Sequence, residues 1–133
     1  MLSTEAIKNI KKAREVFKAE YEERIHISLE AKIDELVEHA LQNGESRIQI
    51  NVSTLYNHID KYRDEIVLGI KEDYEILEKD YADAIVDLAE SDIKTQESIL
   101  PFRKESAQIA MNDYAQKISL PATAEGYNLT ITL

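Results

Sequence analysis

A run of 41 residues without Gly or Pro, from Ser3 to Asn43, is the feature that most limits how this sequence can fold. Its apolar side chains recur every three or four positions, as in an amphipathic helix. A helix over 3–43 would measure about 60 Å at 1.5 Å per residue. A small round core cannot bury a stripe of that length. We therefore expect the helix to pack against another long helix, from the same chain or from a second copy.

Both ends of this predicted helix carry boundary signals. Ser3 is a residue type that caps the first turn, with Thr4 as the alternative. Asn43-Gly44 is a suitable end, because Gly tolerates the left-handed conformation that follows many helices. The helix is therefore expected to end just before residue 44.

Two short segments alternate between apolar and polar residues, which is typical of half-buried strands. The first is 47–52 and the second is 127–133. Their apolar faces would consist of Ile48, Ile50 and Val52 in the first and Leu129, Ile131 and Leu133 in the second. Two such strands are not stable alone in water. We expect them to pair, within one chain or between copies, under a cover of helices.

A second long helix is predicted over 54–100, either continuous or broken near 91–95. Its apolar stripe makes nine steps over the 33 residues from Leu55 to Leu88, about 3.67 residues per step, which favours straight or slightly right-handed packing. Ser53 or Thr54 would cap it.

A third, shorter helix is predicted over 102–118, after Pro101 has ended or kinked the second. Residues 121–126 read as a loop before the last strand. The expected fold is one domain over 1–133 and mainly α: a long antiparallel helical hairpin, a shorter third helix and a small two-stranded β-sheet.

Composition excludes several classes of site. The chain has no Cys, so disulfides, thiolate nucleophiles and Cys-ligated zinc are ruled out. No run approaches the ~18 apolar residues of a membrane span, and the first residues lack the apolar core of a secretory signal. The cytoplasm is the expected location. A net charge of −10 disfavours direct binding to nucleic acid or to a membrane surface.

The acidic residues are concentrated in one region. The segment 72–97 contains ten acidic and two basic residues, whereas 1–18 contains five basic and two acidic ones. One interpretation is an acidic ridge that imitates nucleic-acid phosphates and binds a basic partner protein. The predicted partner-binding residues are Asp73, Asp80, Asp83, Asp87 and Glu90, together with Tyr74 and Tyr81 as aromatic contacts.

The alternative interpretation of the acidic segment is a structural one. In an antiparallel hairpin, residue n would face residue 97 − n, so the basic residues 8–18 would face 79–89. The opposite charges would then pair along the rim, and the remaining acidic residues would be solvated.

Motifs that carry chemistry are scarce. Glu23 and His26 match the Glu-x-x-His spacing of di-iron bundles, but such a site needs a second copy of the motif. The row formed by Glu22, His26 and Glu30 reads equally well as helix surface. Phosphate-binding glycine loops are absent from the sequence. The sequence therefore predicts no catalytic residue, no cofactor and no metal ion.

These observations predict a non-enzymatic protein-binding accessory factor, an inhibitor or adaptor that occludes a larger partner protein. Small, acidic, Cys-free chains with few site motifs are common among phage and mobile-element accessory proteins. A structural or assembly protein that forms a helical homo-oligomer is the alternative, because two helices of about 40 residues carry more apolar stripe than a short third helix covers. A further alternative is the acidic nucleic-acid mimic.

Overall fold

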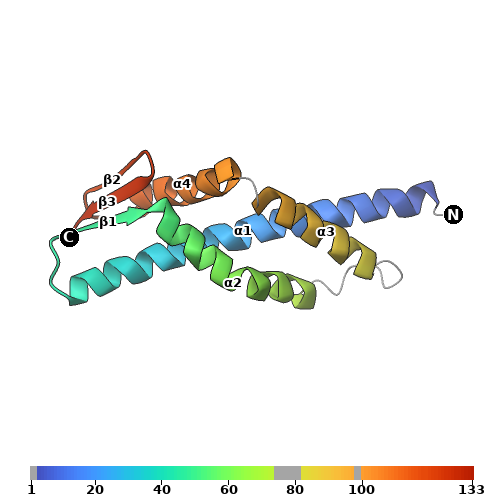
Figure 1. Cartoon of the computed structure of the whole chain (residues 1–133), viewed down its shortest axis with the longest axis horizontal. Helices are drawn as coiled ribbons and strands as arrows, with labels where there is room; N and C mark the ends of the chain where they lie inside the picture. Colours follow the sequence, from blue (N-terminus) through green and yellow to red (C-terminus); the bar gives the residue numbers. More distant parts are fainter. Residues whose placement is uncertain (1–2, 74–81, 98–99) are drawn as a thin grey trace.

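The computed structural model describes residues 3–73, 82–97 and 100–133, with the side chains of 82–86, 97 and 100–102 left out. Within these ranges the chain forms four helices and one antiparallel three-stranded sheet (Figure 1). The helices are α1 (Thr4–Gln42), α2 (Val52–Asp73), α3 (Ala82–Glu97) and α4 (Leu100–Lys117). The strands are β1 (Arg47–Asn51), β2 (Ala122–Glu125) and β3 (Asn128–Thr132). The predicted mainly α fold with a small sheet is confirmed.

The ends of α1 follow their predicted signals. The hydroxyl oxygen of Ser3 accepts a hydrogen bond from the backbone N–H of Ala6 at 3.1 Å, which makes Ser3 the N-cap. At the other end, Asn43 is the C-cap and Gly44 has a φ of 71°. Gly44 is suited to this position because side chains with a Cβ rarely adopt positive φ.

The buried stripe of α1 winds around the helix. Its buried members recur at steps of four residues: Phe17, Tyr21, Ile25, Leu29, Ile33 and Val37. Because a helix turns about 100° per residue, each step of four moves the stripe about 40° around the axis. Over five steps the stripe therefore turns through about 200°. One straight partner helix cannot cover a stripe that moves halfway around its neighbour.

Several elements share this task, and α1 contacts α2, α3, α4 and β1. Figure 1 shows α2 running in the direction opposite to α1, whereas α3 and α4 run in the same direction as α1. Ion pairs agree with the parallel arrangement of α1 and α4, because His26 contacts Asp113 and Glu30, one turn later, contacts Lys117. The helix α1 is therefore central, with one antiparallel neighbour, α2, and two parallel neighbours, α3 and α4.

The predicted helix over 54–100 is wrong as a single element. Its described residues belong to α2, to α3, which runs in the direction opposite to α2 (Figure 1), and, at Leu100, to α4. The alternative break near 91–95 is wrong too, because α3 is continuous through it, with Ala89 and Ile93 buried one turn apart. The two helices are needed because the buried stripe of α1 winds around its axis, so helices must pack on it from more than one side. The local periodicity of 54–100 does not encode this requirement.

This reversal also changes which residues face each other. In the predicted hairpin, where residue n faces residue 97 − n, residue 83 would lie opposite Arg14. In the structure, Arg14 pairs with Asp92 of α3 instead. The rule holds on α2, where Arg24 pairs with Asp73. It fails on α3 because that helix runs parallel to α1.

The sheet joins the two predicted strands within one chain. Its order is β1-β3-β2, so β3 is the central strand. In the β1–β3 register, Ile48 lies opposite Ile131 and Ile50 opposite Leu129. The expected pairing of these two apolar faces is confirmed.

The predicted loop over 121–126 is a third strand. Here Ala122–Glu125 forms β2, which pairs with β3 through a turn at Gly126, where φ is 60°. Ala, Glu and Pro are poor strand formers, so the segment lacks the usual composition. Ala122 and Ala124 pack against the core, and this contact compensates for their low propensity.

Two helix starts also differ from their predicted positions. Helix α2 begins at Val52, and the side chain of Asn51 accepts from the backbone N–H of Ser53 at 2.9 Å, so Asn51 takes the capping role expected of Ser53 or Thr54. Helix α4 begins at Leu100, with Pro101 in its first turn. Proline is tolerated there because first-turn N–H groups have no partner inside the helix.

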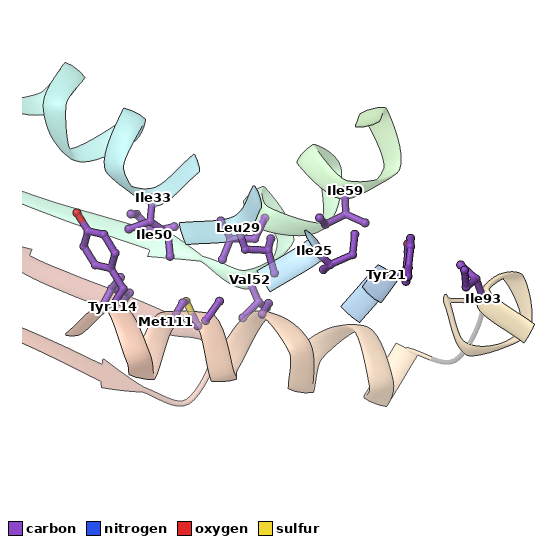
Figure 2. Close-up of a cluster of buried hydrophobic side chains, with 14 of the residues drawn as sticks. Tyr21, Ile25, Leu29, Ile33, Ile50, Val52, Ile59, Ile93, Met111 and Tyr114 are labelled. Atoms are coloured by element: carbon purple, nitrogen blue, oxygen red, sulfur yellow. The ribbon is translucent and has the colours of Figure 1, made fainter. Parts of the chain in front are cut away.

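One continuous core connects the helices with the sheet. Figure 2 shows Ile33 of α1 close to Ile50 of β1, with Tyr21 at the other end of the cluster, where Ile93 of α3 lies. Leu29, Ile33, Leu129 and Ile131 are at most 1% exposed. The core therefore follows α1 from Phe17 toward the sheet.

We predict that Leu129→Ala lowers the free energy of unfolding by about 2–5 kcal/mol, because it leaves a cavity at a fully buried position of the central strand. Urea denaturation followed by circular dichroism measures this change. Thr132→Ala is the matched control, since Thr132 lies on the same strand and is exposed. Equal effects of the two substitutions would contradict the placement of the core.

Candidate functional site

The predicted acidic ridge is partly engaged in contacts within the chain. The carboxylate of Asp73 accepts a hydrogen bond from Arg24 at 2.7 Å, and Glu90 forms an ion pair with Lys71. Asp87 is exposed on α3. Three of the predicted residues, Tyr74, Asp80 and Tyr81, lie outside the residues that the structure describes. For Asp83 the structure describes the backbone, which is part of α3, but not the side chain. Asp73 and Glu90 thus have structural partners, and Asp87 is the predicted residue that points to solvent.

A neighbouring carboxylate, Asp92, makes the shortest contact among the described residues of the acidic segment with α1. The Nε and Nη2 atoms of Arg14 each donate a hydrogen bond to Asp92 at 2.5 Å. These bonds lower the pKa of Asp92 from its usual 3.8, against the opposing effect of burial, and the charge of Lys18 lowers it further. The basic start of α1 and the acidic α3 therefore meet through a two-pronged ion pair.

The first turns of α1 form the least covered part of the described helices. None of residues 4–16, which we call the N-terminal arm, is buried. Figure 1 shows the arm extending past the start of α3. Ile7 is 42% exposed and Val16 is 43% exposed, large fractions for aliphatic side chains. The arm is a helix that the rest of the described chain does not enclose.

Charge sets the arm apart from the rest of the chain. Lys8, Lys11 and Lys12 are exposed along it. Ala6, Ile10 and Ala13 follow one another at helical spacing and are half-buried. The arm thus combines an apolar edge with exposed ammonium groups in a chain whose net charge is −10.

A Ser–His pair links α1 and α2. The Oγ of Ser28 lies 2.9 Å from Nε2 of His58, whose pKa is lowered by burial and by the charges of Lys32 and Lys61. Acyl transfer also needs N–H donors aimed at an oxyanion. The backbone N–H groups around Ser28 lie in the middle of a 39-residue helix and are used by its hydrogen bonds. The Ser28–His58 contact therefore contributes to the packing of α1 against α2.

A cluster of metal-ligand types lies between α1 and α4. The Nε2 of His26 is 3.1 Å from a carboxylate oxygen of Glu30 and 3.2 Å from one of Asp113. All three side chains are half-buried. The spacing of His26 and Glu30 on α1 is visible in the sequence, but the third member comes from α4, 87 positions after His26. No local signal relates Asp113 to the other two residues.

The tyrosines that the structure describes range from buried to exposed, with Tyr56 and Tyr62 half-buried. Tyr21 is 2% exposed and Tyr114 is 8% exposed, so both belong to the core. The hydroxyl of Tyr114 donates a hydrogen bond to Asp34 at 2.6 Å, and burial together with that carboxylate raises its pKa. Tyr127 is 49% exposed and lies under the ammonium group of Lys104. Tyr21 and Tyr114 are therefore packing residues rather than contact points for a partner.

In the described part of the chain, no helix has both the length and the apolar character needed to cross a membrane. Comparisons of the whole chain with protein-family models, with curated proteins and with solved structures find no match in any of the three. The function must therefore be inferred from the side chains described above.

We predict that Asp92→Asn lowers the thermal midpoint at neutral pH more than Asp87→Asn does, because Asp92 carries the ion pair with Arg14 and Asp87 is exposed. The folded pKa of Asp92 is lowered, so its stabilisation is present above the unfolded value of 3.8 and is lost as the pH falls through the folded value. The difference between the wild type and Asp92→Asn should therefore shrink below pH 3.8. Scanning calorimetry from pH 2 to pH 7 measures this, and a difference independent of pH would contradict it.

Proposed function

We propose that this chain is a non-enzymatic protein-binding factor that occludes part of a partner protein, with the N-terminal arm as its binding element. The observation that carries this proposal is the exposure of the arm, where no residue is buried although Ile7, Ile10 and Val16 are apolar. Amphipathic helices of this kind bind in grooves, with residues three and four positions apart as anchors. An inhibitor or adaptor of the phage or mobile-element type, located in the cytoplasm, fits this description and stays a prediction.

The chemistry of the arm indicates what its partner offers. Ile7 and Ile10 would enter an apolar groove, because burying each side chain contributes about 1.5–3 kcal/mol relative to leaving it exposed. Lys8, Lys11 and Lys12 would lie near carboxylates at the rim. Such rim charges mainly accelerate association and select the partner. The expected partner is therefore a protein with an apolar groove that has acidic edges.

A second copy of the chain is the other candidate partner. On α3, Asp87 is exposed and Leu88 is 40% exposed, so this face offers an acidic and apolar surface to a basic, apolar helix. The sequence favours a homo-oligomer because two long helices carry more apolar stripe than a short third helix covers. Between Phe17 and Val37 that stripe is covered within one chain. In the described part of the chain, the proposal of self-association therefore rests on the arm and on this face of α3.

The acidic nucleic-acid mimic has less support than either candidate. Asp73 and Glu90 are paired with Arg24 and Lys71, so these two carboxylates are partly neutralised within the chain. A mimic of phosphates needs charges that stay available to a basic partner.

The binding role predicts a position-dependent cross-link. A photo-reactive amino acid at Ile7 should cross-link a partner protein in cells that naturally express the chain, because the position is exposed on the proposed binding helix. The same amino acid at Leu41 is the matched control, since Leu41 is 51% exposed near the other end of α1. Mass spectrometry of the products identifies what is joined.

The products separate the candidates. A conjugate with another protein, formed from position 7 only and lost with Ile10→Asp, supports the binding factor. A conjugate of two copies of the chain would replace it with the homo-oligomer. Equal conjugates from positions 7 and 41, or none from either, would show that the arm is not a binding element.

A further inference from the structure

We infer that His26, Glu30 and Asp113 form a binding site for a divalent transition-metal ion, with Zn²⁺ as the best match, between α1 and α4. The inference is independent of the proposed binding role of the arm. Its basis is that one imidazole nitrogen and two carboxylates converge from two helices, with their ligand atoms within 4.8 Å of one another.

The spacing of the ligand atoms fits a metal centre. Zinc bonds of about 2.0–2.1 Å in a tetrahedral arrangement place neighbouring ligand atoms about 3.3–3.5 Å apart. The Nε2 of His26 lies 3.1 Å from Glu30 and 3.2 Å from Asp113, close to that separation. The two carboxylates can close on an ion by side-chain rotation, since all three residues are only half-buried.

Hydrogen bonding from His26 alone cannot fully serve both carboxylates, and Glu30 takes a second donor from Lys117. An imidazole nitrogen carries at most one proton, and ionised carboxylates only accept. A single N–H at Nε2 of His26 would have to be shared between Glu30 and Asp113, which weakens each of the two hydrogen bonds. A cation between the three groups would satisfy them together, and it would neutralise two carboxylate charges on facing helices.

The donor types select the class of ion. Imidazole and carboxylate together suit Zn²⁺ and the neighbouring ions Co²⁺, Ni²⁺ and Mn²⁺, whereas Mg²⁺ and Ca²⁺ prefer oxygen ligands alone. Three protein ligands leave a fourth position for water. Zinc is the first choice because it accepts a tetrahedral site of this composition.

The surroundings allow an ion to enter. A groove of about 330 Å³ runs beside His26 between the two helices, lined by Tyr21, Glu22, Ile25, His26, Glu105, Ser106 and Ile109. Its carboxylates make the approach negative, which favours a cation. Lys117 competes, because its Nζ lies 3.0 Å from the same oxygen of Glu30 that faces His26. Its side chain is 66% exposed and can swing away into solvent.

Calorimetric titration of Zn²⁺ into chelator-treated protein at pH 7.5 tests the site. We expect one ion per chain, a rise in the thermal midpoint, and visible d–d absorption when Co²⁺ replaces Zn²⁺. His26→Asn and Asp113→Asn should each weaken binding at least about tenfold. His39→Asn should bind like the wild type, because His39 lies on the exposed surface of α1, away from the cluster, next to Asn43. Circular dichroism verifies that each variant is folded.

Lys117→Gln adds a variant with the opposite expectation. It removes the competing ammonium group, so it should bind Zn²⁺ at least as tightly as the wild type. Three results would overturn the inference: no binding up to about 1 mM Zn²⁺, equal binding by folded His26→Asn, or a loss of binding in His39→Asn. The first would leave His26 as a histidine that contacts the carboxylates of Glu30 and Asp113 without a metal ion.

Discussion

The rest of the structure depends on the apolar stripe of α1, which winds around its own helix. Six buried residues follow one another at steps of four from Phe17 to Val37. A step of four exceeds the 3.6 residues of a helical turn, so the stripe rotates as it advances. Cover must therefore come from a different direction at each level: α3 near Arg14, α2 and α4 beside Arg24 and His26, and the sheet at Ile33.

This requirement explains the path of the chain. Helix α2 leaves the sheet antiparallel to α1, and α3 and α4 then return in the same direction as α1 (Figure 1). Helix α4 contacts β2 and β3 of the sheet, and β3 lies between β1 and β2. The winding stripe begins at Phe17, so the preceding turns have no buried residue and form the arm. The exposed arm is thus a consequence of where the stripe starts.

Local signals predicted much of this fold. The failures share one cause, which is that they depend on contacts between distant segments of the chain. Ser3 and Gly44 set the ends of α1, and alternation at Ile50 and Leu129 predicted the strands and their pairing. The reversal between α2 and α3 was missed because no Gly or Pro lies between Asp73 and Ala82. Strand β2 depends on core contacts rather than on propensity. The site residues are harder still, since Asp113 meets His26 only through the parallel docking of α4.

That parallel docking has an electrostatic cost that the seam between α1 and α4 must offset. Parallel helices align their dipoles side by side, which is unfavourable. The seam also brings Glu30 and Asp113 to the same imidazole. Lys117 supplies one positive charge at Glu30. A divalent ion would supply more, and because it would bind only when α4 lies on α1, its binding would stabilise this docked arrangement by mass action. The seam is therefore where the stability of the fold would respond to metal concentration.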